Sequence, residues 1–149
     1  MYTKILVPLD GSPRAEAILS HVEELARRHQ AEIVLLRVVE LPSISGFEGY
    51  DPAWHRETLE QLRDEAANYL EEVDQRLKNE GVSVSHQVLN GPVVSCVLQA
   101  AEDAGADLIA MASHGRGGIG RVFYGSVAAG ILHRVDRPLL LIRARQSNA

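Results

Sequence analysis

The sequence is poor in cysteine, in aromatic side chains and in long apolar segments. It has one cysteine among 149 residues, Cys96, so no disulfide can form within the chain. Cys96 lies in the apolar run 93–98, where a buried, unreactive thiol is favoured over a nucleophile. No apolar run approaches the roughly 20 residues that a membrane-spanning helix needs. We therefore expect neither a disulfide framework nor a membrane partner.

The chain also lacks an excess of basic residues. Its formal net charge is −5, which argues against sequence-independent binding to nucleic acid. An apolar fraction of 46% and a charged fraction of 23% are typical of a globular protein, and the length suits one domain over residues 1–149. The apolar run beginning at Ile5 leaves no room for a signal peptide, so we expect a cytoplasmic protein.

Recognisable catalytic and metal-binding sets are missing as well. The chain contains neither H-E-x-x-H nor the P-loop pattern G-x-x-x-x-G-K-[ST], and its histidines have no cysteine partner. The carboxylates of segment 55–79 are interpreted as a solvated helix face rather than a paired active site. We expect no protein metal site and no catalytic residue. The six histidines are His21, His29, His55, His86, His114 and His133.

Short apolar runs alternate with stretches of helical periodicity. The runs that predict strands are 5–7, 33–39, 82–88, 107–111 and 138–142. The stretches that predict helices are 13–29, 55–79, 91–105 and 126–135. This alternation predicts parallel β-α-β units, and hence a doubly wound α/β domain with five strands and helices on both faces of the sheet. Periodicity leaves the strand order open.

Three local signals mark the helix ends and the loops. Ser12 before Pro13 is typical of an N-cap followed by the first helical residue, and Gly81 suits the end of the long helix. Residues 41–54 form the one long irregular stretch. Loops of that length are often functional lids or are mobile, and the sequence does not decide between the two.

A glycine-rich turn follows the fourth predicted strand. Residues 111–118 begin with apolar side chains and end in a glycine-rich segment, and the next predicted helix begins at Gly125-Ser126. Glycines let the backbone approach an anion, and the free N–H groups of a helix start point at its charge. This arrangement predicts a bound phosphate. Ser126 could donate to that phosphate and cap the helix at the same time. Arg116 and Arg121 add positive charge nearby, although each of them alone is more typical of an ordinary surface residue.

Asp10 ends the first strand and has two interpretations of about equal weight. Ligands of open α/β sheets bind beyond the carboxyl ends of the strands, so Asp10 could accept hydrogen bonds from an adenine or a ribose. It could equally be a turn residue before Gly11. His114 could serve as an acid–base group, but we favour a hydrogen-bonding loop residue.

Residues 115–120 match the dinucleotide pattern G-x-G-x-x-G, but their context is wrong. That pattern closes the first strand of its unit, with an acidic residue at the end of the next strand. Here Asp136 precedes the final strand, and no further unit follows. A dinucleotide enzyme is therefore the least favoured hypothesis.

Taken together, these segments resemble the universal stress protein family over almost the whole chain. The ending is the most specific part of the likeness, and the order of the segments also matches. The segments that carry the resemblance are 5–12, 35–39, 91–92, 106–109, 113–118, 125–128 and 137–142.

The family's ATP-binding branch has the motif G-x2-G-x9-G-[ST]. This chain matches it at Gly115, Gly125 and Ser126, but has Ala112 in place of the first glycine. The extra methyl group is a mild change where the backbone φ is negative. It obstructs where φ is positive, or where the residue touches the ribose or phosphates.

The resemblance implies a site, a fold and an assembly. It implies an adenine nucleotide alpha hydrolase-like fold with strand order 3-2-1-4-5, and a homodimer along the fifth strand, which would otherwise be an exposed apolar edge. Pro8, Leu9, Asp10 and Val38 would line the adenine and ribose pocket. Met111, Ala112, His114, Gly115 and Arg116 would pass under the ribose and phosphates, and Gly125, Ser126, Val127 and Ala128 would hold the phosphates.

The resemblance therefore implies an ATP-binding regulatory protein of the stress response. It would not be an enzyme beyond slow ATP hydrolysis, with Mg²⁺ arriving on the nucleotide. The alternative is a dimeric interaction module of the same fold that no longer binds nucleotide. Ala112 favours the alternative, whereas the intact remainder of the motif favours ATP binding.

Overall fold

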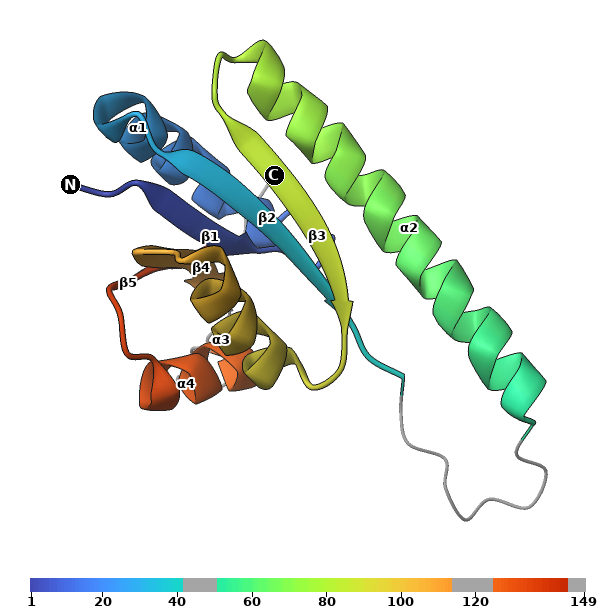
Figure 1. The fold of residues 1–149 in the computed structure, drawn as a ribbon. Helices are drawn as coiled ribbons and strands as arrows, with labels where there is room; N and C mark the ends of the chain where they lie inside the picture. Colours follow the sequence, from blue (N-terminus) through green and yellow to red (C-terminus); the bar gives the residue numbers. More distant parts are fainter. Residues whose placement is uncertain (42–50, 114–124, 145–149) are drawn as a thin grey trace.

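Five parallel strands form one sheet in the order β3-β2-β1-β4-β5 (Figure 1). The computed structural model describes residues 1–41, 51–113 and 125–144. The five-stranded parallel sheet and its strand order are confirmed. The strands are β1 (Lys4–Pro8), β2 (Glu32–Val39), β3 (Val84–Asn90), β4 (Leu108–Ser113) and β5 (Leu139–Arg143).

Helices cover both faces of the sheet, as predicted, and each face has its own apolar core. Val22 of α1 and Leu70 of α2 pack on the face that includes Ile5. Ile131 of α4 packs with Leu6 on the opposite face, together with α3. Each fully buried side chain of this size contributes about 1.5–3 kcal/mol to folding. The helices are the 3₁₀ helix η1 (Ala15–Ile18), α1 (Leu19–His29), α2 (Pro52–Asn79), α3 (Val93–Ala104) and α4 (Gly125–Arg134).

The start of the first helix differs from its prediction. Ser12 accepts a hydrogen bond from the Ala15 backbone N–H at 3.1 Å, as a capping serine does. The following turn is tightened by a bond from the Ala17 N–H to the Arg14 carbonyl, and regular α-helix begins at Leu19. The predicted helix over 13–29 is therefore a short 3₁₀ helix followed by α1.

The long helix begins earlier than predicted. The side chain of Asp51 accepts a hydrogen bond from the Ala53 backbone N–H at 2.9 Å, and Pro52 occupies the first helical position. Residues 52–54, expected in the irregular stretch, are therefore helical. Residues 42–50 of that stretch lie outside the described residues. Gly81 has a φ of 82°, as a residue at the end of a helix often does.

α2 is 28 residues long and carries charged residues along its length. Within the described part of the chain, no helix is both long enough and apolar enough to cross a lipid bilayer.

Asp107 joins the starting ends of β1 and β4. Its carboxylate accepts bonds from the Thr3 N–H at 2.8 Å, the Thr3 hydroxyl at 2.9 Å and the Lys4 N–H at 3.1 Å. Burial raises the pKa of Asp107, but these hydrogen bonds outweigh burial and the pKa lies below its ordinary value. The two central strands are thus fixed to each other at the end opposite the pocket described below.

Asp74 is a buried acid on the supposedly solvated face of α2. Its relative exposure is 1%, and its carboxylate lies 2.6 Å from Nδ1 of His86 on β3 and 2.8 Å from Nζ of Lys78. Burial raises the pKa of Asp74, but the hydrogen bonds with Lys78 and His86 together lower it below the ordinary value. The interpretation of a uniformly solvated charged face is wrong at this position, because the carboxylate attaches α2 to the edge strand.

We expect Asp74→Asn to lower the free energy of unfolding at pH 7 by about 1–3 kcal/mol, because a buried charged hydrogen-bonding group is lost. The contribution of the carboxylate is complete above the ordinary aspartate pKa of about 3.9 and disappears as the pH falls through the lower folded-state pKa. The difference between wild type and variant should therefore shrink below about pH 4. Urea unfolding at several pH values measures it.

Asp64→Asn is the matched control, because Asp64 lies exposed on the same helix. It should leave the unfolding free energy within about 0.5 kcal/mol of wild type. A difference for Asp74→Asn that stays constant from pH 7 to pH 3 would contradict the proposed role of the carboxylate.

α3 and α4 approach closely at Gly130. A Cβ atom at this position would lie 2.7 Å from Cγ2 of Val94, which is closer than side-chain atoms pack. The glycine therefore fixes how near α4 comes to α3. That spacing matters for function, because the first turn of α4 forms one wall of the pocket described below.

Gly130→Ala should destabilise the protein by about 1–3 kcal/mol through overpacking, despite the intrinsic preference of alanine for helices. In a Val94→Ala background the same change should cost much less, because the clashing methyl group is gone. Thermal unfolding of the four proteins of this double-mutant cycle measures the coupling. Equal costs in both backgrounds would show that the two side chains do not set the spacing.

Candidate functional site

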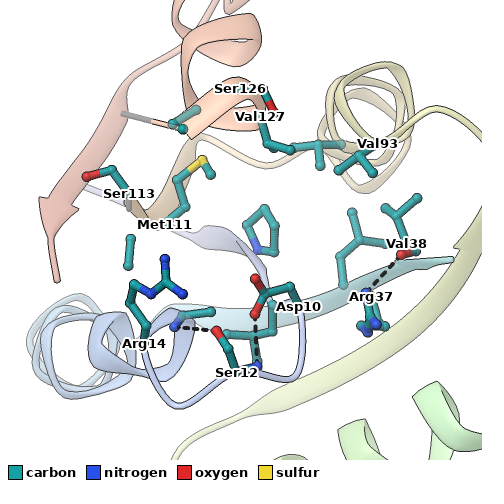
Figure 2. Close-up of a pocket in the computed structure, with 18 residues that line it drawn as sticks. Asp10, Ser12, Arg14, Arg37, Val38, Val93, Met111, Ser113, Ser126 and Val127 are labelled. Carbon is teal, nitrogen blue, oxygen red and sulfur yellow. Dashed lines mark hydrogen bonds between the residues drawn. The ribbon is translucent and has the colours of Figure 1, made fainter. Parts of the chain in front are cut away.

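A pocket of about 170 Å³ opens at the carboxyl ends of β1, β2 and β4 (Figure 2). It lies where the winding of the sheet reverses, since β1 leads to β2 on one side and neighbours β4 on the other. Its lining residues are Pro8, Leu9, Asp10, Ser12, Arg14, Ala15, Leu36, Arg37, Val38, Val93, Val97, Met111, Ala112, Ser113, Gly125, Ser126, Val127 and Ala128.

The pocket opens because β1 and β4 separate. The two strands pair at Ile5 with Leu108 and at Leu6 with Ile109, yet β1 continues to Pro8. Residues of a central strand face its two neighbours alternately, and the Leu9 N–H donates to β2, at the Leu36 carbonyl. Pro8 therefore falls on the side of β4 and has no N–H to donate, so the ladder to β4 does not continue.

Asp10 fulfils the turn role considered for it and also lines the pocket. Its Oδ1 accepts a hydrogen bond from the Ser12 backbone N–H at 2.9 Å. This bond and the one from Ala15 to Ser12 hold the turn between β1 and η1. The bond uses Oδ1, which leaves Oδ2 for a ligand. Figure 2 shows the carboxyl group of Asp10 directed toward the interior of the pocket.

One end of the pocket is largely apolar. Val38 and Leu36 come from β2, and Val93 and Val97 come from α3. Arg37 also lines this end, where its Nη1 donates to the Val38 backbone carbonyl at 3.0 Å. A flat aromatic base could be buried here, with backbone and carboxylate groups nearby to orient it.

Met111, Ala112 and Ser113 close the pocket from β4. Ala112 is paired with Ile142 inside the strand and is not among the described residues with a positive φ. Its methyl group therefore does not strain the backbone, which removes one of the two objections to alanine at this motif position. The hydroxyl of Ser113 donates to the Ile142 carbonyl at 3.2 Å, and Figure 2 shows it pointing away from the pocket.

The first four residues of α4, Gly125 to Ala128, all line the pocket. These are the residues of a helix whose backbone N–H groups lack partners within the helix, and the positive end of the helix dipole lies there. Gly125 has a φ of 76°, which explains a glycine at this position. Ser126 is the second residue of α4 and lines the pocket, so its expected role as a phosphate donor stays a prediction.

The structure brings the predicted site residues together wherever it describes them. Ten of the thirteen line this one pocket: Pro8, Leu9, Asp10, Val38, Met111, Ala112, Gly125, Ser126, Val127 and Ala128. The remaining three, His114, Gly115 and Arg116, lie outside the described residues, as does Arg121.

Sequence reasoning missed several lining residues, of which Arg14 carries the most chemistry. Arg14 lies four positions after Asp10, in a turn whose geometry no periodicity reveals. Val93 and Val97 of α3 have the spacing of one helical turn, which signals a buried face but not the cavity beside it.

The described part of the chain shows neither a cluster of metal-binding side chains nor an activated cysteine. No group of three or more His, Cys, Asp or Glu side chains among the described residues could hold a metal ion. Cys96 is half-buried rather than fully buried, and burial raises the pKa of its thiol, which is the opposite of activation. The arrangement can bind and orient a ligand, with amides and a serine at one wall and apolar side chains at the other.

Comparison with known proteins identifies the family. The universal stress protein family model matches residues 1–143. Universal stress protein MJ0577 of Methanocaldococcus jannaschii is 28% identical over 159 residues, covering 99% of this chain and 98% of the relative. A solved structure of protein MJ0577 superposes with a TM-score of 0.83 at 30% identity and covers 99% of both chains.

More distant structures share the fold. A universal stress protein solved in complex with cAMP has a TM-score of 0.70 at 19% identity, covering 97% of this chain and 98% of that one. A family protein from Arabidopsis thaliana with AMP bound has a TM-score of 0.68 at 16% identity, covering 97% and 93%. At these identities the likeness concerns the fold alone. With the family model matching nearly its full length, the chain belongs to the universal stress protein family.

Proposed function

We propose that this chain is an ATP-binding regulatory protein whose bound nucleotide tunes its shape or its partners. The observation that carries the proposal is one pocket, lined by every described residue of the expected site and by the first turn of α4. Solved structures of the same fold with cAMP or AMP bound support an adenine nucleotide as the ligand. The family match over residues 1–143 supports treating the whole chain as one domain.

In this proposal the adenine lies at the apolar end, near Val38 and Asp10. Oδ2 of Asp10 accepts from the base or the ribose, and Leu36 and Val38 pack against the rings. The phosphates lie against the amides of Gly125 to Ala128, with the Ser126 hydroxyl as a further donor. Mg²⁺ arrives with the nucleotide, because we assign it no protein ligand.

The alternative of an interaction module without nucleotide rests on Ala112. Its backbone conformation supports retention of the site, since an alanine without positive φ introduces no strain. Its position on the pocket wall leaves steric contact with the ligand as the remaining objection.

We propose a regulatory rather than an enzymatic role, with hydrolysis of ATP slow at most. The described lining residues of the pocket include no histidine, their one carboxylate, Asp10, is held in the turn by the Ser12 N–H, and Ser113 is engaged with β5. Slow turnover suits a switch, because the bound state persists long enough to be sensed by a partner.

Ser126 provides the sharpest test of the phosphate site. Ser126→Ala removes the hydroxyl and should weaken ATP binding about tenfold, as expected for the loss of a hydrogen bond to a charged group. Ser126→Pro also removes the backbone N–H, and proline is tolerated in the first turn of a helix. It should weaken binding about a hundredfold. Titration calorimetry with MgATP measures both.

Ser95→Ala makes the matching change in the first turn of α3, at an exposed position outside the pocket, and should bind ATP as wild type does. Circular dichroism checks that each variant is folded. If both Ser126 variants bind ATP with wild-type affinity, α4 does not contact the phosphates. If the wild type does not bind ATP, the result favours the alternative of an interaction module without nucleotide.

We also propose a homodimer formed along β5. This strand is at the edge of the sheet, bonded to β4 on one side, and its apolar residues Leu139 to Ile142 are half-exposed. An apolar edge of this kind is a template for pairing with another strand. Light scattering should give twice the mass of the chain in dilute solution. A concentration-independent monomer mass would refute the dimer.

A further inference from the structure

Arg14 has a positive charge that no described residue neutralises. It is half-buried, in the turn between β1 and η1, and its guanidinium makes no hydrogen bond or ion pair with any residue that the structure describes. Other arginines of similar burial are engaged. Arg137, for example, bonds to two backbone carbonyls and to the carboxylates of Glu102 and Asp136.

The turn around Arg14 is held in place by its neighbours. Asp10 accepts from the Ser12 N–H at 2.9 Å, and Ser12 accepts from the Ala15 N–H at 3.1 Å. Arg14 lies between these anchored residues, so its backbone is fixed, while its side chain is bonded to none of residues 1–41, 51–113 and 125–144. Figure 2 shows the guanidinium extending from η1 into the pocket, toward the side where Met111 lies.

The two arginines among the described lining residues lie at opposite ends of the pocket. Arg37 is beside Val38, where its guanidinium is bonded to the Val38 carbonyl. Arg14 is at the other end, beside the last residues of β4 (Figure 2). The apolar end suits a base, so the free guanidinium is at the end where a phosphate chain would extend.

A half-buried cation that pairs with no described residue is best explained by a bound anion that neutralises it. Guanidinium groups bind phosphates through two parallel hydrogen bonds and keep their charge at any physiological pH. The attraction grows with the charge of the ligand, so it is larger for ATP than for AMP and absent for adenosine.

We propose that Arg14 is a specificity-determining residue that makes the pocket prefer the more highly phosphorylated adenine nucleotides. This inference rests on the nucleotide site proposed above. The backbone amides of α4 bind phosphate in any nucleotide, whereas Arg14 adds a charge-dependent contribution from the opposite wall. The ratio of affinities, rather than affinity itself, is its signature.

The test compares the affinities of wild type and Arg14→Gln for MgATP, ADP, AMP and adenosine, measured by titration calorimetry. The variant should lower the ATP-to-AMP affinity ratio about tenfold and leave adenosine binding unchanged. Arg14→Lys keeps the charge but loses the two-pronged geometry, so it should recover part of the ratio. Arg28→Gln is the matched control, because Arg28 is an exposed arginine of α1 outside the pocket, and it should leave the ratio at its wild-type value.

Each outcome has a distinct meaning. An equal loss of affinity for all four ligands, adenosine included, would show that Arg14 affects the shape of the pocket rather than interacting with the charge of the phosphates. That result would overturn the inference. Unchanged affinities would overturn it as well. If wild type binds none of the four ligands, the nucleotide site itself fails. Thermal unfolding of Arg14→Gln should match wild type, because the side chain makes no bond in η1.

Discussion

The short pairing between β1 and β4 is the constraint on which the site depends. The strands are bonded at Ile5 and Leu6, fixed at their starting ends by Asp107, and then separate where Pro8 offers no donor. Beyond that point the chain from β1 turns to one face of the sheet and the chain from β4 leads to the other. The crevice between them is the product of topology and of one residue that cannot continue the ladder.

The elements that form the walls of this crevice are each fixed in position by contacts outside it. α4 is held against α3 at a distance set by Gly130, so its first turn faces the crevice at a fixed position. The turn after β1 is held by the side chains of Asp10 and Ser12, each of which accepts a hydrogen bond from a backbone N–H group of the turn. Far from the site, the contact between Asp74 and His86 attaches α2 to β3 at the edge of the sheet. A binding site needs this kind of support, because ordering mobile walls when the ligand binds would cost entropy and weaken the affinity for the ligand.

Much of the fold could be predicted from the sequence, because buried strands and amphipathic helices have strong periodic patterns. The strand order could not be derived from periodicity and came from the family resemblance. The described residues that were expected at the site were found together in one pocket, including Asp10 and Gly125. Arg14 was missed because its role depends on the direction of a turn, and Asp74 was misread because its partner, His86, comes from another element. The helix start at Pro52 was missed although Asp51 before proline is a local signal.

A crystal structure of the full chain grown with excess MgATP tests the central claim most directly. The account predicts electron density for the adenine beside Val38 and Asp10, and for the phosphates against Gly125 to Ala128. A pocket that stays empty at saturating ATP, or a nucleotide bound elsewhere on the molecule, would contradict it.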